Sequence, residues 1–196
     1  MIIQTIARKI ACKLNHITES DNPKAGIEVL QYGIECILNS VITICAILTF
    51  GFFTHSIVLC LIWMVSFSLL RSVIGGYHAP NHESCILFSV FFCIITVMLC
   101  KHILVSNLII ILTSIISLLF IIKYVPLYSM QNNILTDDKK KTTKYKALSF
   151  SLLSSFLSLI SKNNFPSISH MLSITLFSVI LLAETEIIRR ILKNIY

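Results

Sequence analysis

The sequence predicts an all-α, polytopic integral membrane protein, with about six transmembrane helices and an N-terminal amphipathic helix at the membrane interface. Of its 196 residues, 56% are hydrophobic and only 13% are charged, and the mean hydropathy is +0.85. A soluble domain of this size could not bury so much apolar surface. The apolar residues also gather in long runs whose ends carry the cations, as in membrane segments and their flanks. We expect residues 1–196 to form a single membrane domain.

Charge and cysteine content exclude two other classes of protein. The formal net charge is +7, from 16 Lys and Arg against 9 Asp and Glu. The basic runs lack the interleaved aromatic residues that stack on bases, so nucleic acid is not an expected partner. The seven cysteines are odd in number and form no C-x-x-C pair. Neither a disulfide framework nor a thiolate zinc site is therefore predicted.

Residues 1–22 are predicted to form an amphipathic helix on the membrane lipid. Apolar residues recur there at helical spacing, and Arg8, Lys9 and Lys13 share the other side. The apolar positions are Ile3, Ile6, Ile10, Leu14 and Ile17. Packing of this helix on the rest of the protein is the alternative. Asn22-Pro23 is typical of a helix cap followed by proline at the first helical position.

Six apolar segments follow, at 34–53, 54–70, 85–100, 103–122, 147–161 and 167–183. A membrane span needs about 20 residues, so the short, serine-rich segment 147–161 is the exception, and a re-entrant segment is the alternative there. If the N-terminus is cytoplasmic and all six segments span, only Lys101 and Lys162 of the 16 Lys and Arg residues face outward. This positive-inside bias predicts cytoplasmic termini and a cytoplasmic loop at 71–85.

The loop 71–85 is the candidate for chemistry because it gathers reactive side chains between two apolar segments. A thiolate is a strong nucleophile, and a neighbouring histidine can take the thiol proton, so Cys85 and His78 form a candidate catalytic pair. Seven residues separate them, which is about 10 Å along an unbroken helix. The chain must therefore fold back, and the adjacent Gly75 and Gly76 permit this.

Three charged residues could support that pair, each with a plainer alternative. Arg71 could bind a carboxylate or an oxyanion, or serve only as an orientation charge. Glu83 could orient His78, or lie on the loop surface. Glu35 lies just inside the first apolar segment, where a carboxylate is a functional candidate by default. It could instead simply reach water.

Two rival interpretations of the loop stay open. His78, His82 and Cys85 form an H-x-x-x-H-x-x-C pattern that could ligate zinc or copper on a helix. A proline between the histidines argues against that helix, so no metal and no cofactor is expected. The other rival is a small non-enzymatic transporter or sensor with a metal- or redox-sensitive loop.

The polar stretch 123–146 is predicted to be a cytoplasmic basic loop. It carries Lys139, Lys140 and Lys141 in succession. These lysines could contact anionic lipid head groups, or they could dock an acidic partner.

Four short motifs together resemble the accessory gene regulator B family. They are Gln-Tyr-Gly-Ile-Glu at 31–35, Leu-Leu-Arg at 69–71, Gly-Gly-Tyr-His-Ala at 75–79 and Cys85. Their order and spacing match over about residues 25–100, and Pro126 with the following lysine-containing loop is similar to the rest of that family.

The resemblance implies a quorum-sensing endopeptidase of a bacterial cell membrane. It implies a short propeptide as substrate, with an amphipathic leader, a central core and an acidic C-terminal tail. The residue matching the nucleophile is Cys85 and the residue matching the base is His78. An acyl-enzyme on the cysteine would be captured by a cysteine or serine of the core, which would release a cyclic thiolactone or lactone. The resemblance also implies a homodimer.

Overall fold

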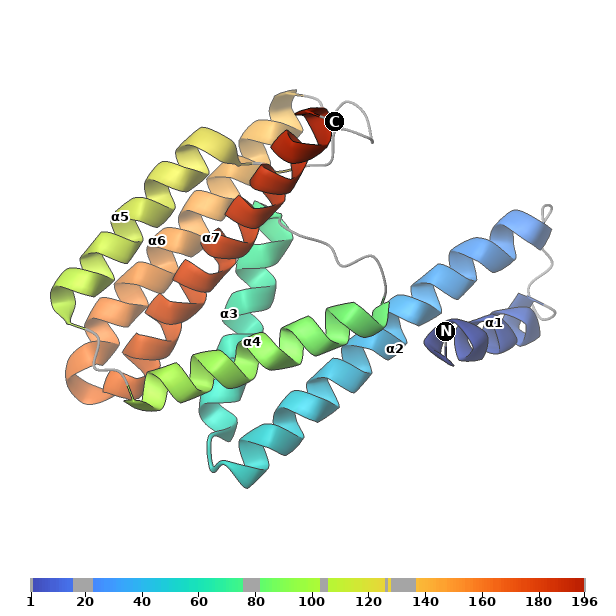
Figure 1. Cartoon of the computed structure of the whole chain (residues 1–196), viewed down its shortest axis with the longest axis horizontal. Coiled ribbons are helices and arrows are strands. Elements are labelled where there is room, and N and C mark those ends of the chain that lie inside the picture. The colour runs from blue at the N-terminus through green and yellow to red at the C-terminus, as the bar shows by residue number, and fades with distance from the viewer. Residues whose placement is uncertain are drawn as a thin grey trace. The chain divides into compact units, whose positions relative to one another are not determined.

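The computed structural model describes residues 2–15, 23–75, 82–102, 106–125, 127 and 137–195. Within these ranges the ordered elements are helices (Figure 1). They are α1 (Ile2–Asn15), α2 (Pro23–Phe53), α3 (Ile57–Ile74), α4 (His82–His102), α5 (Asn107–Tyr124), α6 (Asp137–Asn164) and α7 (Pro166–Ile195). The all-α prediction is therefore confirmed.

Among the described residues, five helices are long and apolar enough to cross a membrane. The five stretches are Ile27–Phe53, Ile57–Ile74, Glu83–His102, Asn107–Tyr124 and Pro166–Arg189. They coincide with five of the six predicted apolar segments, and the sixth segment, 147–161, lies within α6. The protein is a multi-pass, all-α membrane protein.

The chain divides into two compact units. Unit 1 contains Met1–Phe50 and His78–Phe92, and unit 2 contains Gly51–Tyr77 and Cys93–Tyr196. Unit 1 therefore holds α1, most of α2 and the first half of α4, while unit 2 holds α3, α5, α6, α7 and the second half of α4. The prediction of a single domain stays a prediction.

Helix α1 buries one strip of small and apolar residues and leaves another exposed. Ile3, Ala7 and Ala11 are buried, whereas Ile6 and Ile10 are exposed. The described part of α1 therefore combines the two alternatives that its sequence left open: one strip packs within unit 1, and the neighbouring strip is available to lipid. The next helix, α2, begins at Pro23, as predicted from the proline at its first position.

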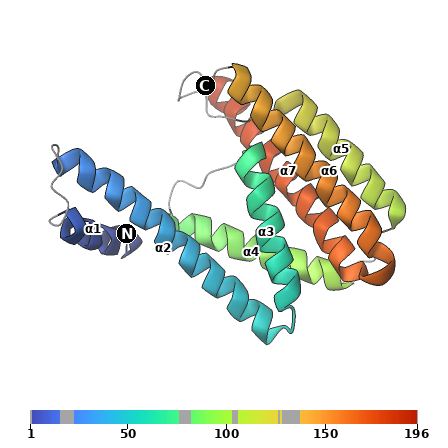
Figure 2. The ribbon, with the colours of Figure 1, turned by 180° about the vertical axis from the view of Figure 1, so that it is seen from behind.

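Helices α6 and α7 are the central pair of unit 2. They pack along each other, and α3 and α5 each contact both of them. Figures 1 and 2 show α5, α6 and α7 lying side by side along their lengths. Helix α7 is accordingly the most buried of the five candidate spans.

Helix α6 corrects two boundaries drawn from the sequence. We expected a loop as far as Lys146, but the helix begins at Asp137, so the lysine run lies on its first turns. Lysine is a good helix former, and an aspartate in the first turn complements the helix dipole, so this polar stretch is helical without being apolar. The segment 147–161 is thus the continuation of a 28-residue helix, which is about 42 Å long.

The polarity of α6 is inverted relative to that of a soluble helix. Its buried positions in the second half are Ser151, Ser154, Ser155 and Ser158, and its exposed positions include Leu152, Leu153, Phe156, Leu157, Leu159 and Ile160. Small polar residues inside and large apolar residues outside are the pattern of a helix packed on other helices and surrounded by lipid. The pattern favours a spanning α6 over a re-entrant one.

Hydroxyl groups connect α6 to both of its neighbours. Ser151 lies 3.1 Å from Ser117 of α5, oxygen to oxygen. Ser158 donates to the carbonyl of Ser169 at 2.9 Å, and its oxygen lies 3.1 Å from the Ser169 hydroxyl and 2.7 Å from the Ser173 hydroxyl of α7. We call these five residues the hydroxyl seam.

Candidate active site

Cys85 lies in the first turn of α4, close to the start of the helix at His82. Its side chain is half-buried and its thiol is free of any disulfide. The first backbone N–H groups of a helix have no partner within the helix, and together with the dipole they stabilise a negative charge there. This end of α4 therefore suits a reactive thiolate better than the middle of a span does.

The loop predicted at 71–85 is shorter than expected. Helix α3 continues to Ile74 and α4 begins at His82, so Arg71, Glu83 and Cys85 are all on helices. The predicted boundaries of the loop rested on apolar content alone. Apolar content cannot detect polar residues that continue a helical turn. Gly76 and His78 lie outside the described residues. The Cys85–His78 pairing therefore stays a prediction.

Arg71 occupies the last turn of α3 and is half-buried. Its guanidinium carbon lies 5.6 Å from the centre of the Phe67 ring, within the range of a cation–π contact. The Arg71 carbonyl accepts a hydrogen bond of 3.0 Å from the N–H of Gly75, which closes the end of the helix. Arg71 therefore lies at the helix end that leads directly into residues 76–81.

Gly75 adopts a backbone conformation that other residues avoid. Its φ is +83°, in the region that favours glycine. Its backbone is bridged in parallel to Leu127, beyond the end of α5, and the Leu127 N–H reaches the Ile74 carbonyl at a long 3.4 Å. A Cβ at position 75 would lie 3.0 Å from the Leu127 carbonyl oxygen. Both the torsion and the close approach therefore require glycine there.

The basic residues of α6 fall into two structural kinds. Lys139, Lys140 and Lys141 are exposed on the first turns of the helix. Lys144 is half-buried instead, and its ammonium group donates to the backbone carbonyl of Ile122, in the last turn of α5. Lys144 thus fixes the end of α5, while the other three project a positive charge that a partner could reach.

Glu35 is buried, with 6% of its surface exposed. Its Oε1 accepts a hydrogen bond of 2.8 Å from the side-chain amide of Gln31, one turn earlier on α2. The alternative that this carboxylate simply reaches water is therefore wrong. Both residues belong to the 31–35 motif, so the motif pairs a buried carboxylate with a half-buried amide within unit 1.

Glu83 is exposed in the first turn of α4, where its negative charge complements the helix dipole. Within the described part of the chain, no group of three or more His, Cys, Asp or Glu side chains could hold a metal ion. The His78, His82 and Cys85 alternative is outside that statement, because His78 is not among the described residues.

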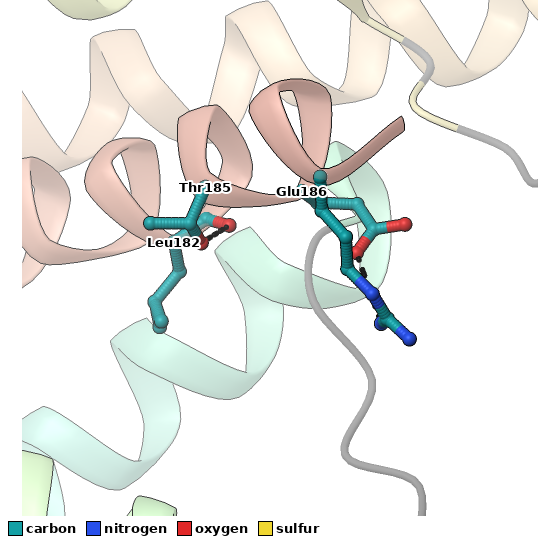
Figure 3. Close-up of polar contacts among 4 residues, drawn as sticks. Leu182, Thr185 and Glu186 are labelled. Carbon is teal, nitrogen blue, oxygen red and sulfur yellow. Dashed lines mark hydrogen bonds and ion pairs between the residues drawn. The ribbon is translucent and has the colours of Figure 1, made fainter. Parts of the chain in front are cut away.

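The sequence analysis missed three contacts, two of which carried no signal in the sequence. The Leu127 bridge and the Lys144 contact each join residues far apart in the chain. The third is on α7, where Glu186 Oε2 lies 3.7 Å from the guanidinium of Arg189. Figure 3 shows Glu186 beside the α3 ribbon, and the nearby Thr185 hydroxyl donates to the Leu182 carbonyl at 2.9 Å. The i, i+3 spacing of Glu186 and Arg189 is the one signal that could have indicated the pair.

Comparison with known proteins extends the resemblance beyond the four motifs. The model of the accessory gene regulator B (AgrB) family matches residues 3–185. An AgrB-like protein 2 of Clostridium perfringens (strain 13 / Type A) is 25% identical over 167 residues, which cover 82% of this chain and 75% of the relative. An AgrB-like protein of C. perfringens (strain SM101 / Type A) is 25% identical over 163 residues, which cover 80% of this chain and 73% of that relative.

No solved structure matches the chain significantly. The family match, by contrast, runs from α1 into the second half of α7 and includes every candidate site residue. The chain therefore belongs to the accessory gene regulator B (AgrB) family of the agr quorum-sensing system.

Proposed function

We propose that this chain is a membrane-embedded cysteine endopeptidase that removes the C-terminal tail of a propeptide and promotes its cyclisation to a (thio)lactone signal. The observation that carries the proposal is the position of Cys85. It is half-buried in the first turn of α4, and residues 76–81, which include His78, immediately precede that helix. Family membership supplies the biological setting, which is quorum sensing.

The position of Cys85 separates it from the cysteines that lie deep in the candidate spans. Cys60, Cys93 and Cys100 are buried within the spans. Cys45 is exposed, but it lies well inside the long span of α2, where an exposed side chain faces lipid. A thiol in any of these places lacks the unpaired backbone N–H groups of a helix start. Cys85 is the better nucleophile on those grounds.

The reaction balances with one thiol and one base. His78 takes the proton of Cys85, and the thiolate attacks the carbonyl of the peptide bond before the acidic tail. The tail leaves as an amine with the proton from His78, and the rest of the peptide stays on Cys85 as a thioester. A cysteine or serine of the peptide core then attacks that thioester, closes the ring and regenerates the Cys85 thiol. A thioester keeps the acyl group activated, so cyclisation is near energy-neutral if water is excluded.

The remaining predicted site residues have supporting roles in this proposal. Arg71 would bind the peptide carboxylate or the oxyanion from the last turn of α3. Glu83 would orient the imidazole, and Gly75 and Gly76 would let the chain turn towards α4. Glu35, whose buried carboxylate accepts a hydrogen bond from Gln31, would stabilise α2 within unit 1.

The exposed lysines 139–141 are proposed to dock the acidic tail of the propeptide. Reversal of all three to glutamate should weaken processing, because the docking contact becomes repulsive. The matched control is Lys162→Glu, a charge reversal at the far end of α6. Unchanged processing in the triple reversal would sink the docking role and leave the catalytic proposal intact.

We also propose that both termini and Cys85 face the cytoplasm of a bacterial cell. The support is the charge distribution, since only Lys101 and Lys162 among the lysines and arginines would then face outward. A propeptide made in the cytoplasm would meet Cys85 directly. A homodimer is proposed from the family resemblance alone.

The proposal is tested by reconstituting the protein in bilayers with the small acidic-tailed peptide encoded beside its gene, and recording intact masses. Wild type should show a peptide-sized adduct and release the tail. Cys85→Ala should do neither, and His78→Ala should lose at least about 100-fold in rate. Cys45→Ala, a cysteine change inside a span, should behave as wild type. Tail release by Cys85→Ala would refute the peptidase and favour the transporter or sensor.

A further inference from the structure

Two buried cysteines of unit 2 contact each other, Cys60 of α3 and Cys93 of α4. Both are 0% exposed, and both thiols are free of any disulfide. A hydrogen bond joins the two thiols. The cysteines are 33 positions apart in the chain, so the packing of two helices brings them together and no local motif does.

Each cysteine belongs to the buried strip of its own helix. On α3 the strip continues through Trp63 and Phe67, three and then four residues further on, which is the spacing of one helix face. On α4 the buried Val97 follows Cys93 by one turn. Both thiols therefore point into the helix packing of unit 2 and away from lipid.

Gly51, in the last turn of α2, leaves room for one of the thiols. A Cβ at position 51 would lie 3.0 Å from the Cys60 sulfur and 3.2 Å from the Cα of Ile57. Both contacts would be too close for a comfortable fit, so the sulfur occupies its present position because glycine has no side chain. The Cys60 sulfur is thus covered by the end of α2 and hydrogen-bonded to Cys93.

We propose that Cys60 and Cys93 are a redox-active dithiol, which a peroxide oxidises to a disulfide between α3 and α4. The inference goes beyond the proposed function and does not depend on it, because neither thiol takes part in the peptidase reaction. A disulfide needs its sulfurs at about 2.05 Å. Two thiols that are already hydrogen-bonded need only a small further approach.

The reaction balances with one hydrogen peroxide per pair. One thiol loses its proton and attacks the O–O bond, which forms a sulfenic acid and releases a first water. The other thiol attacks the sulfenic sulfur, so the S–S bond forms and a second water leaves. Two electrons thus pass from the thiols to the peroxide. The product is neutral, which suits an apolar interior better than two thiolates around a soft metal ion such as Cu(I).

The test is to treat the full-length protein in bilayers with hydrogen peroxide, block the remaining thiols with N-ethylmaleimide, and digest the denatured protein with trypsin. Arg71 is the one lysine or arginine between the two cysteines. Trypsin therefore places Cys60 on peptide 25–71 and Cys93 on peptide 72–101. Mass spectrometry should find these two peptides joined, with two hydrogens fewer than their sum, and dithiothreitol should separate them.

Matched cysteine variants identify the joined positions. Cys60→Ala and Cys93→Ala should each lower the yield of the joined peptides by about tenfold or more. Cys45→Ala and Cys100→Ala remove a cysteine from the same two peptides and should keep the wild-type yield. Cys100 is a stringent control because it is also buried, but its thiol donates to the Ser167 carbonyl at 3.0 Å. Helix content identifies any variant that fails to fold, and the fragment masses of the wild-type pair then decide.

The disulfide should also stabilise unit 2, because it constrains the unfolded chain. Oxidised wild type should need a higher fraction of sodium dodecyl sulfate to unfold than reduced wild type, and Cys93→Ala should show no such shift. Free thiols in peroxide-treated wild type would refute the proposal. So would joined peptides that persist in Cys60→Ala or Cys93→Ala, since other cysteines would then form the link. A joined protein that unfolds no later than the reduced one would refute the link between α3 and α4 as a native contact.

Discussion

Replacement of Ser158 by alanine should destabilise unit 2 more than any other single hydroxyl deletion in the seam. Ser158 is 1% exposed and makes three contacts with α7, at 2.9 Å, 3.1 Å and 2.7 Å. A serine hydroxyl has one donor and two acceptor positions, so these contacts use its full capacity. Alanine would abolish all of them and add none.

The magnitude follows from the membrane setting. Hydrogen bonds between transmembrane helices average about 0.6 kcal/mol each, so three contacts amount to about 2 kcal/mol. That loss would raise the unfolding equilibrium constant about 30-fold. The partners Ser169 and Ser173 can turn to carbonyl groups of their own helix, so the loss should not greatly exceed this value.

The assay is reversible unfolding of the protein in mixed detergent–lipid bicelles, followed by the loss of helical circular dichroism. Ser149→Ala is the matched control, because Ser149 is exposed on the same helix and donates only to the carbonyl of Tyr145 one turn back. We expect the control to stay within about 0.5 kcal/mol of wild type. Equal stability of the two variants would refute the claim that the seam joins α6 to α7.

Three further predictions concern α2 and α6. Lys144→Met should speed amide hydrogen exchange in the last turn of α5, because its carbonyl cap is lost, whereas Lys146→Met, an exposed neighbour, should not. Glu35→Ala should cost about 1 kcal/mol of unfolding free energy, since it removes the acceptor of the half-buried Gln31 amide; no change would show that water replaces the carboxylate. Lys141→Cys and Asn163→Cys place thiols about 33 Å apart along the helix. An impermeant maleimide should label these two thiols from opposite sides of the membrane if α6 spans it, and from one side if α6 is re-entrant.

Five of the spans could be predicted from hydropathy because lipid selects directly for apolar side chains. The start of α2 was also predictable, since Asn22-Pro23 carries a local signal for a helix start. Polar helix ends were not predictable in this way. Helix α4 begins at His82 and α6 at Asp137, both within stretches that composition assigned to loops.

The candidate site was predictable only in part, for a similar reason. The predicted apolar segment 85–100 begins at Cys85, and Cys85 lies in the first turn of α4. Gly75 was singled out for its backbone freedom, and its positive φ confirms that need. The partner that makes glycine necessary is Leu127, which lies 52 positions along the chain. No local sequence pattern predicts a main-chain contact between two residues so far apart in the chain.

The Gly75–Leu127 bridge and the hydroxyl seam lie in the same unit, so a change in the seam acts on processing through the stability of that unit. The seam ties α5 to α6 through Ser117 and Ser151, and Lys144 of α6 holds the end of α5 that leads to Leu127. Loss of the seam should therefore lower activity only to the extent that the unit unfolds. Ser158→Ala should process peptide at the wild-type rate under conditions where it is fully folded. Slow processing by fully folded Ser158→Ala would instead mean that the packing of α6 on α7 contributes to the reaction itself.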